Sequence, residues 1–298
     1  MATIWESLAK EYGDAAAEHG RSVVTVLGRR HPASGVLWSE DAVVTVNHAV
    51  RTDRVPVTLT AGKTVSAQVA GRDASTDVAV LRLEGSLDGK PAKWTGTSGL
   101  RVGELVLALA RTWRGNIVAS SGIVGGLMGS FRTWRGGELD QFIRPDLNFY
   151  PGFSGGPLVG ATGVIGINTA GLHRSPVTIP ASTLSRVVPE LLEKGTIQRP
   201  YVGVAMNAVP LQESLRHKLN LTSSEGLLIV HVEPDGPADR AGVLVGDVLL
   251  ELNGQPVAST DDVQEILRST GPGKIVSANI VRGGALQKVQ ITTAVRTR

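Results

Sequence analysis

The segment of this sequence best suited to chemistry places a serine among glycines, at residues 150–158. A serine hydroxyl is a poor nucleophile unless a base removes its proton and hydrogen-bond donors stabilise the oxyanion that forms. The glycines around Ser154 allow a sharp bend, which makes the N–H groups of Gly152 and Ser154 candidate donors to a substrate carbonyl oxygen. A bare Ser-Gly-Gly-Pro is more often a surface turn, so a catalytic role requires partners elsewhere in the chain.

A histidine and an aspartate at the ends of two apolar runs supply such partners. His48 follows the run at residues 42–47, and Asp77 precedes the run at residues 78–83. A buried carboxylate beside an imidazole fixes its tautomer and stabilises the imidazolium. The chain order His, Asp, Ser is that of chymotrypsin-type enzymes, whereas subtilisins and α/β-hydrolases use other orders. Each residue alone has a commoner structural explanation, but together they predict a Ser-His-Asp triad.

The elements that must position these residues are short strands. Runs of β-type residues separated by turn residues occupy 22–27, 35–38, 42–46, 55–59, 65–70, 78–83, 105–110, 117–123, 158–159 and 164–168. Many short strands without helices between them predict an antiparallel barrel or sandwich. The 36 glycines and the 4% aromatic content also favour a turn-rich β protein over a helical bundle.

Three helices and a linker complete the expected organisation. Apolar spacing predicts an amphipathic helix in the first twenty residues, and a second at residues 182–194 with Ser182 as its N-cap and a disturbance at Pro189. A linker at residues 195–200 precedes a smaller unit of strands and one helix, which a capping box at residues 259–262 begins. In that unit, Asn253-Gly254 predicts a tight turn.

Composition excludes several other functions. The chain has no cysteine, so disulfides, thiolate metal sites and a cysteine nucleophile are excluded, and no metal-binding motif appears. We therefore expect no metal and no cofactor. The 30 basic and 27 acidic residues are dispersed, which argues against nucleic-acid binding. No segment has the roughly 18 apolar residues needed to span a membrane, and the start of the chain lacks a secretion signal. As written the chain is expected in the cytoplasm, or in the periplasm or cell envelope if it was trimmed.

Several motifs in a fixed order identify a resemblance that covers about residues 22–293. They include Thr45-Val46-Asn47-His48-Ala49-Val50, Gly71-Arg72-Asp73, Asp77-Val78-Ala79-Val80-Leu81, Ser154-Gly155-Gly156-Pro157-Leu158 and Ile165-Gly166-Ile167-Asn168-Thr169-Ala170. In these the chain resembles the HtrA/Deg-type serine proteases. The resemblance implies a mainly β fold: a chymotrypsin-like double six-stranded β-barrel plus a C-terminal α+β PDZ domain.

The resemblance also implies roles and boundaries. His48 would be the general base, Asp77 its orienting partner and Ser154 the nucleophile, with Gly152 and Ser154 forming the oxyanion hole. The expected domains are an N-terminal helix at 1–20, a protease domain at 21–198 and a PDZ domain at 199–298. The implied function is a serine endopeptidase that cleaves misfolded or unstructured polypeptides.

The C-terminal unit carries its own binding motif. Successive backbone N–H groups in a glycine-containing loop can bind the terminal carboxylate of a peptide, and the next strand can pair with that peptide. Tyr201-Val202-Gly203-Val204 resembles the carboxylate-binding loop of PDZ domains. The resemblance implies these four residues as the peptide-binding loop, with Val263, Ile266 and Leu267 lining the groove for the peptide side chains. Peptide C-termini are therefore expected partners, for recruitment or regulation.

Phe153 is the main departure from the family pattern, which usually has asparagine before the serine. A phenylalanine cannot make the polar contacts of that loop, so an alternative function is a catalytically impaired, HtrA-like peptide-binding or chaperone scaffold. The pocket-wall segment at residues 176–180 predicts cleavage after small or aliphatic residues.

A pentapeptide of Arg, Thr, Trp, Arg and Gly occurs twice, at residues 111–115 and 132–136. The two copies are interpreted either as loops that sense a bound peptide or order the catalytic loop, or as two unrelated exposed loops. At the N-terminus, Trp5, Leu8 and Tyr12 form an apolar stripe. It would join subunits into a homotrimer or larger homo-oligomer, as in relatives, or cover the barrel of the same subunit.

Overall fold

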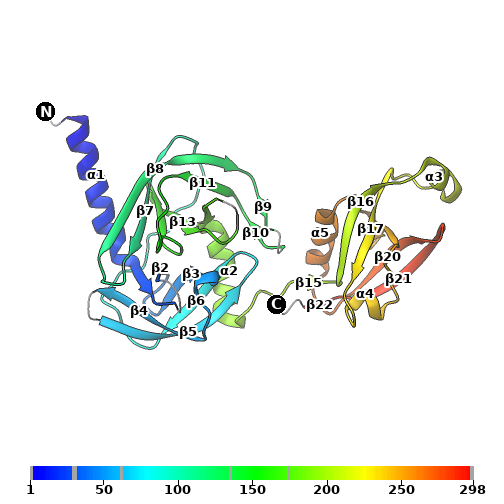
Figure 1. Ribbon diagram of the computed structural model, residues 1–298, viewed down its shortest axis with the longest axis horizontal. Coiled ribbons are helices and arrows are strands. Elements are labelled where there is room, and N and C mark those ends of the chain that lie inside the picture. The colour runs from blue at the N-terminus through cyan, green and yellow to red at the C-terminus, as the bar shows by residue number, and fades with distance from the viewer. Residues whose placement is uncertain (1–2, 29–31, 61–62, 134–135, 174, 296–298) are drawn as a thin grey trace. The chain divides into compact units, whose positions relative to one another are not determined.

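The structure is a computed structural model that describes residues 3–28, 32–60, 63–133, 136–173 and 175–295 (Figure 1). The chain forms two compact units, residues 1–197 and 198–298. In the first unit, two closed six-stranded barrels confirm the predicted mainly β fold. Among the described residues, no helix is both long and apolar enough to cross a membrane.

The first barrel has the strand order β1-β2-β3-β6-β5-β4 and carries two of the three predicted triad residues at its strand ends. Its strands are β1 (Val23–Val26), β2 (Ala33–Leu37), β3 (Ala42–Val46), β4 (Arg54–Thr60), β5 (Lys63–Asp73) and β6 (Val78–Leu83). β1, β2 and β3 are buried along their whole length, which explains why they read as continuous apolar runs rather than alternating ones. A short 3-10 helix, η2 (Asn47–Ala49), follows β3.

The second barrel has the order β11-β14-β13-β12-β7-β8 and carries the predicted nucleophile. Its strands are β7 (Leu105–Arg111), β8 (Ile117–Met128), β11 (Phe142–Asp146), β12 (Pro157–Gly160), β13 (Gly163–Thr169) and β14 (Val177–Pro180). The small hairpin of β9 (Phe131–Arg132) and β10 (Glu138–Leu139) extends from it.

Helix α2 (Ala181–Lys194) joins the cores of the two barrels (Figure 1). Its buried face, with Leu184, Val187, Val188 and Leu191, packs in one cluster with Val44 and Val78 of the first barrel and Ile167 and Ile179 of the second. Burying one such side chain contributes about 1.5–3 kcal/mol. The relative position of the barrels therefore rests on a shared apolar core.

Two expectations about α2 were tested by the structure. The predicted N-cap at Ser182 is wrong: β14 leads directly into the helix, the N-cap position is Pro180, and no side chain caps it. The helix then runs through Pro189, which lies on its exposed face, and ends at Gly195 with a left-handed φ of 75°.

The N-terminal helix α1 (Ile4–His19) confirms the predicted helix and continues into η1 (Gly20–Ser22). None of its residues is fully buried, although Tyr12, Ala15 and Ala16 pack partly against the second barrel through Leu107 and Val159. Ile4 and Trp5 remain 87% and 79% exposed. One end of the apolar stripe therefore covers the helix's own subunit, and the other end is solvent-facing.

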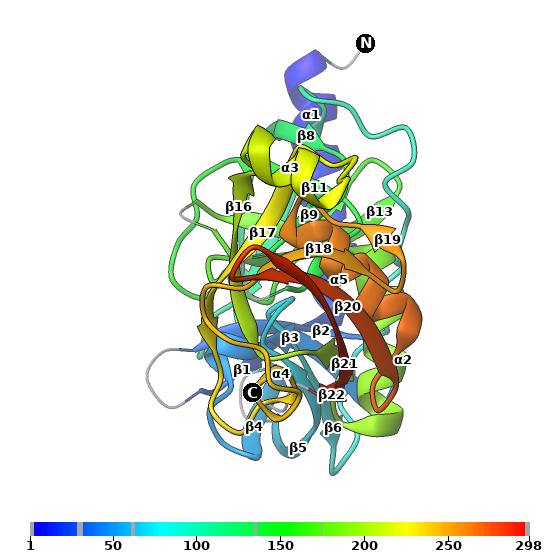
Figure 2. The same ribbon diagram turned by 90° about the vertical axis from the view of Figure 1, so that its right-hand side faces the viewer.

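The second unit contains a sheet with the order β16-β17-β18-β20-β21 and β19 beside β18 (Figure 2). The elements are β15 (Pro200–Tyr201), β16 (Val204–Pro210), α3 (Glu213–Leu219), β17 (Glu225–Val232), α4 (Pro237–Arg240), β18 (Val248–Leu252), β19 (Gln255–Pro256), α5 (Thr260–Thr270), β20 (Ile275–Arg282), β21 (Ala285–Thr292) and β22 (Ala294–Val295). The predicted turn is confirmed, with Asn253 and Gly254 both at positive φ, and so is the capping box that Ser259 and Asp262 form at the start of α5.

An ion pair between the buried Asp247 and the partly exposed Arg282 links two segments of the second unit. Asp247 is 1% exposed and accepts hydrogen bonds from Arg282 Nε at 2.7 Å, Arg282 Nη2 at 2.6 Å and the Leu244 N–H at 2.8 Å. Burial alone would raise the pKa of Asp247, but the hydrogen bonds from Arg282 and Leu244 outweigh it and lower the pKa. Because the folded-state pKa is depressed, this pair stabilises the unit above the unfolded pKa of about 3.9, and the contribution is lost as the pH falls through the folded pKa.

Asp247→Asn is expected to lower the free energy of unfolding of the second unit by about 1–3 kcal/mol at pH 7, because it removes the charge that Arg282 binds. Hydrogen exchange of peptides from residues 198–298 measures the loss. The exposed Asp235→Asn is the control and is expected to have little effect. The difference in the free energy of unfolding between the variant and the natural protein should shrink below pH 4. A difference that is independent of pH would contradict this account.

Candidate active site

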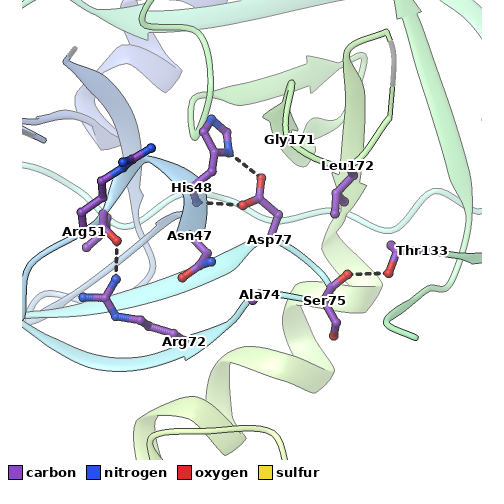
Figure 3. Close-up of a pocket in the computed structure, with 11 residues that line it drawn as sticks. Asn47, His48, Arg51, Arg72, Ala74, Ser75, Asp77, Thr133, Gly171 and Leu172 are labelled. Atoms are coloured by element: carbon purple, nitrogen blue, oxygen red, sulfur yellow. Dashed lines mark hydrogen bonds and ion pairs between the residues drawn. The ribbon is translucent and has the colours of Figure 1, made fainter. Parts of the chain in front are cut away.

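The register of two neighbouring strands brings His48 and Asp77 together. Val46, the last residue of β3, pairs with Val78, the first of β6, so the residues just beyond these strand ends face one another. His48 Nδ1 lies 2.7 Å from Asp77 Oδ2, and the His48 N–H donates to Asp77 Oδ1 at 2.9 Å (Figure 3). The carboxylate therefore holds both the ring and the backbone of the histidine. His48 is 41% exposed at its side chain, while that of Asp77 is 5% exposed.

Asp77 is further held from the second barrel. The hydroxyl of Thr169, the last residue of β13, donates to Asp77 Oδ2, and the Gly171 N–H donates to that hydroxyl oxygen at 2.9 Å. Asp77 has a φ of 58°, a left-handed conformation that aspartate tolerates better than most residues. The hydrogen bonds from His48 and Thr169 fix the orientation of this carboxylate beside the imidazole, as a partner of a catalytic histidine requires.

Gly171 makes room for this pair. A Cβ at this position would lie 2.6 Å from both His48 Nδ1 and Asp77 Oδ2. Such a distance is too short for a side chain, so glycine is required by close packing. Thr169 lies in a motif that carried the resemblance, but neither Thr169 nor Gly171 had been given a role from the sequence.

Two consecutive turns shape the loop that contains Ser154. The Phe153 N–H donates to the Tyr150 carbonyl at 3.2 Å, and the Gly156 N–H donates to the Phe153 carbonyl at 3.0 Å. The third residue of each turn is a glycine at positive φ, Gly152 at 98° and Gly155 at 83°. A positive φ at this position defines a type II turn when the second residue has negative φ, as Pro151 must. The local sequence therefore determines the shape of the loop.

The donors expected for the oxyanion hole are free in this loop. In the part of the chain that the structure describes, neither the Gly152 N–H nor the Ser154 N–H donates to a protein acceptor. The Phe153 carbonyl points back to Gly156, and in a planar trans peptide the Ser154 N–H must then point the opposite way. These two donors are available to a substrate oxygen.

Ser154 itself is tied to the dyad through the backbone rather than through its hydroxyl. Among the described residues, no hydrogen bond joins Ser154 Oγ to His48. The Gly155 N–H instead donates at 2.8 Å to the carbonyl of Asn168, the neighbour of Thr169, which binds Asp77. Catalytic hydrogen bonds are often loose before substrate binds, so this geometry is compatible with a triad.

Phe153 is part of the core of the second barrel. It is 2% exposed, packs in a cluster with Leu158 and Ile165, and has ring centroids 5.9 Å from both Phe149 and Tyr150. The side chain replaces a polar contact by an apolar anchor. Phe153 therefore fastens the residue before the nucleophile to the barrel.

A cavity of about 330 Å³ lies beside the dyad (Figure 3). Its lining residues are Asn47, His48, Val50, Arg51, Arg72, Ala74, Ser75, Asp77, Thr133, Gly171 and Leu172. Most of the residues that line the cavity belong to the first barrel. The hydroxyl of Thr133 donates a hydrogen bond to the Ser75 carbonyl at 2.7 Å, which joins Thr133 to that side of the cavity. The described residues contain no cluster of His, Asp and Glu able to hold a metal ion.

The threonines of the two pentapeptides make the same pair of hydrogen bonds. Thr112 and Thr133 each accept at the carbonyl from the glycine three residues on, at 2.8 and 2.9 Å, and at the hydroxyl from the N–H four residues on. In the first copy, Arg111 is buried and its guanidinium donates to the carbonyls of Val23, Gly115 and Gly20, so its role is structural. Trp113 is exposed and stacks with Arg114. Trp134 and Arg135 of the second copy lie outside the described residues.

The residues expected to bind peptide in the second unit lie on β15, β16 and α5 and in the loop between the two strands. Tyr201 ends β15, Gly203 has a φ of 78°, and Val204 begins β16, which pairs with β17 along one side. In the described part of the unit, no strand pairs with the other side of β16. Val263, Ile266 and Leu267 of α5 are buried in the core of the unit with Val202.

Comparisons with known proteins agree with this architecture. Residues 33–167 match the trypsin-like peptidase domain family, and residues 228–277 match the PDZ domain family. The chain is 33% identical over 274 residues to a protein of Halomonas elongata named a probable periplasmic serine endoprotease DegP-like; the match covers 89% of this chain and 56% of that protein. It is 32% identical over 287 residues to the serine protease Do-like HtrB of Bacillus subtilis, covering 89% of this chain and 62% of that protein.

Solved structures show the same fold over nearly the whole chain. The serine endoprotease from Yersinia pestis matches with a TM-score of 0.74 and 26% identity, over 96% of this chain and 98% of that chain. The HtrA-type protease AlgW with a decapeptide matches with a TM-score of 0.75 and 25% identity, over 96% and 99% of the two chains. The chain is thus a trypsin-like peptidase domain joined to a PDZ domain.

In sequence and fold it is similar to the DegP-like and HtrA-type serine proteases named above. The chain spans only 56% and 62% of the length of the two curated relatives named above.

Phe153→Ala is expected to lower the free energy of unfolding of the first unit by about 3–5 kcal/mol, because it removes a fully buried ring. All five tryptophans lie in that unit, so urea unfolding followed by tryptophan fluorescence measures the loss. Tyr150→Ala is the matched control, since Tyr150 belongs to the same turn and contacts Phe153 but is 55% exposed. Equal losses in the two variants would show that Phe153 is no anchor.

Proposed function

We propose that this chain is a serine endopeptidase in which residues 21–198 cleave peptide bonds and residues 199–298 bind peptide C-termini. The observation that carries the proposal is the bonding of Asp77. Its two oxygens hold the His48 ring and backbone, and the nucleophile loop presents two N–H donors that bind no acceptor among the described residues. This combination is the requirement for attack by an alcohol on an amide.

The proposed reaction begins with Ser154. Its Oγ attacks the substrate carbonyl carbon while His48 takes the hydroxyl proton, and Asp77 stabilises the imidazolium that results. The N–H groups of Gly152 and Ser154 hold the negative oxygen of the tetrahedral intermediate. His48 then gives the proton to the leaving amine, and an acyl-enzyme remains. A water molecule, deprotonated by His48, then attacks the carbonyl carbon of the acyl-enzyme. His48 returns the proton to Ser154 Oγ, and the second product is released as a carboxylic acid.

A catalytically impaired scaffold is the weaker alternative. It was motivated by Phe153, but burial of that ring supports an ordered loop rather than a damaged one. The relatives at 33% and 32% identity are named a probable serine endoprotease and a serine protease, and the comparisons give the scaffold no support. The enzyme is therefore the better proposal.

Misfolded or unstructured polypeptides are the proposed substrates. The cavity of about 330 Å³ beside His48 is large enough for one side chain, and the backbone of a compact protein is engaged in hydrogen bonds within its own structure. A homotrimer or higher homo-oligomer is proposed as the assembly, because the exposed Ile4 and Trp5 form an apolar end on α1.

The proposed peptidase activity is tested with Ser154→Ala. The natural protein should hydrolyse unfolded casein, and the variant should lose at least about 10³-fold in rate, as expected when a covalent nucleophile is removed. Urea unfolding of both proteins controls for the fold. Hydrolysis that persists in Ser154→Ala, or that is absent from the natural protein, would overturn the proposal.

The proposed peptide site is tested with two versions of one peptide, one with a free C-terminal carboxylate and one amidated. Backbone N–H groups near Gly203 should bind the carboxylate, so amidation should weaken binding at least tenfold. Fluorescence anisotropy of labelled peptides on the Ser154→Ala protein measures this without cleavage. Equal affinity for both peptides would exclude a carboxylate site.

A further inference from the structure

Ser34, in β2, makes an unusual set of contacts for a fully buried hydroxyl residue. It is 0% exposed, and its Oγ accepts a hydrogen bond from the Arg111 N–H at 3.0 Å and donates one to the Gly152 carbonyl at 2.8 Å. Arg111 ends a strand of the second barrel, and Gly152 lies in the nucleophile loop. One hydroxyl therefore joins three segments that are far apart in sequence.

The backbone of Ser34 binds the same loop. Its N–H donates to the Ser154 carbonyl at 2.9 Å, and its carbonyl accepts from Thr45 Oγ1 at 2.7 Å. A Cβ on Gly155 would lie 2.0 Å from the Ser34 carbonyl oxygen, so the loop rests directly on β2. The carbonyls of Gly152 and Ser154, on either side of Phe153, are thus both held by Ser34.

This matters because Gly152 has no side chain to restrict it. Glycine populates positive and negative φ with similar ease, so the peptide groups next to Gly152 can rotate at little cost unless something holds them. Rotation would change the type II turn and turn the Gly152 N–H away from a substrate oxygen. Ser34 Oγ holds the carbonyl of the Gly152–Phe153 peptide group, whose N–H closes the turn on the Tyr150 carbonyl. With this peptide group fixed, the turn that leaves the Gly152 N–H pointing toward substrate is supported from one side of Gly152.

We propose that Ser34 is a positioning residue that keeps the oxyanion hole formed before substrate arrives. The inference rests on the proposed peptidase function, since it concerns the same loop. Ser34 does not touch the reacting atoms: it acts through the carbonyls of Gly152 and Ser154. Both hydrogen-bonding capacities of the hydroxyl are used, one as donor and one as acceptor, which alanine cannot replace.

The experiment compares Ser34→Ala with Thr25→Val. Thr25 is also 0% exposed, and its hydroxyl donates to the carbonyls of Thr112 and Arg111, so it binds the same hairpin without touching the nucleophile loop. Both variants lose one buried hydroxyl, and their urea midpoints are expected to fall by similar amounts. Only Ser34→Ala should lose peptidase rate.

For Ser34→Ala we expect kcat on an unstructured peptide to fall about 10- to 100-fold with KM changed less than twofold. This is less than the 10²–10³ typical of removing an oxyanion donor itself. The labelling rate of Ser154 by a fluorophosphonate should fall in parallel, and the shape of the pH–rate profile should stay the same because the dyad is untouched. Equal kcat values in the two variants, or a loss explained by KM alone, would overturn the inference.

A readout that does not need activity separates this inference from the proposed function. In amide NMR spectra, Ser34→Ala should shift the resonances of residues 150–156 and speed the exchange of the Arg111 N–H, whereas Thr25→Val should leave residues 150–156 unchanged. If the natural protein proves inactive, the proposed function fails and these spectra still decide whether Ser34 orders the loop. Unchanged resonances for residues 150–156 in Ser34→Ala would refute it.

Discussion

The buried carboxylate of Asp77 is the interaction on which the first unit depends. A buried carboxylate without donors would cost several kcal/mol, so the fold must bring donors to it from separate elements. The His48 ring and backbone come from the end of β3, and the Thr169 hydroxyl comes from the end of β13. Satisfying this charge therefore requires the β3–β6 register and the joining of the two barrels. The hydrogen bonds that stabilise the buried Asp77 carboxylate are therefore the same ones that place it beside His48.

The shape of the nucleophile loop, in contrast, is determined by residues within the loop itself. Two turns with glycine in the third position determine where its carbonyls point, and within the described parts of the chain they leave the N–H groups of Gly152 and Ser154 without acceptors. Because glycine adopts positive and negative φ with similar ease, such turns form at a small cost in free energy and also change conformation at a small cost. They must be supported from outside, by Phe153 in the core on one side and by Ser34 on the other.

The sequence predicts those features of the molecule that local chemistry determines. The short apolar runs and turns predicted an antiparallel barrel or sandwich, and the motifs that carry the family resemblance implied two barrels, which the structure shows. Asn253-Gly254 predicted its turn, and Ser259 predicted its capping box. The prediction of Ser182 as the N-cap was wrong because β14 leads directly into α2. The residues around Ser182 alone do not reveal this connection.

Thr169 and Ser34 had no assigned role because their partners lie 92 and 118 residues away in sequence, and only the folded chain brings them together. The triad residues were easier to recognise because each sits at the end of an apolar run or between glycines. The role of Phe153 depended on which way its ring points, and that is decided by packing in the second barrel.

The burial of Phe153 bears on how this loop differs from the usual family pattern. A polar side chain before the nucleophile would hold the loop through directional hydrogen bonds, which form or break with small movements. An apolar ring in a packed core holds it through buried area, which is lost only when the ring leaves the core. Phe149 and Tyr150 contact the same ring, so the aromatic residues upstream of Ser154 act together. The substitution thus moves the support of the oxyanion loop from polar contacts to the barrel core, and it leaves the directional part of that support to Ser34.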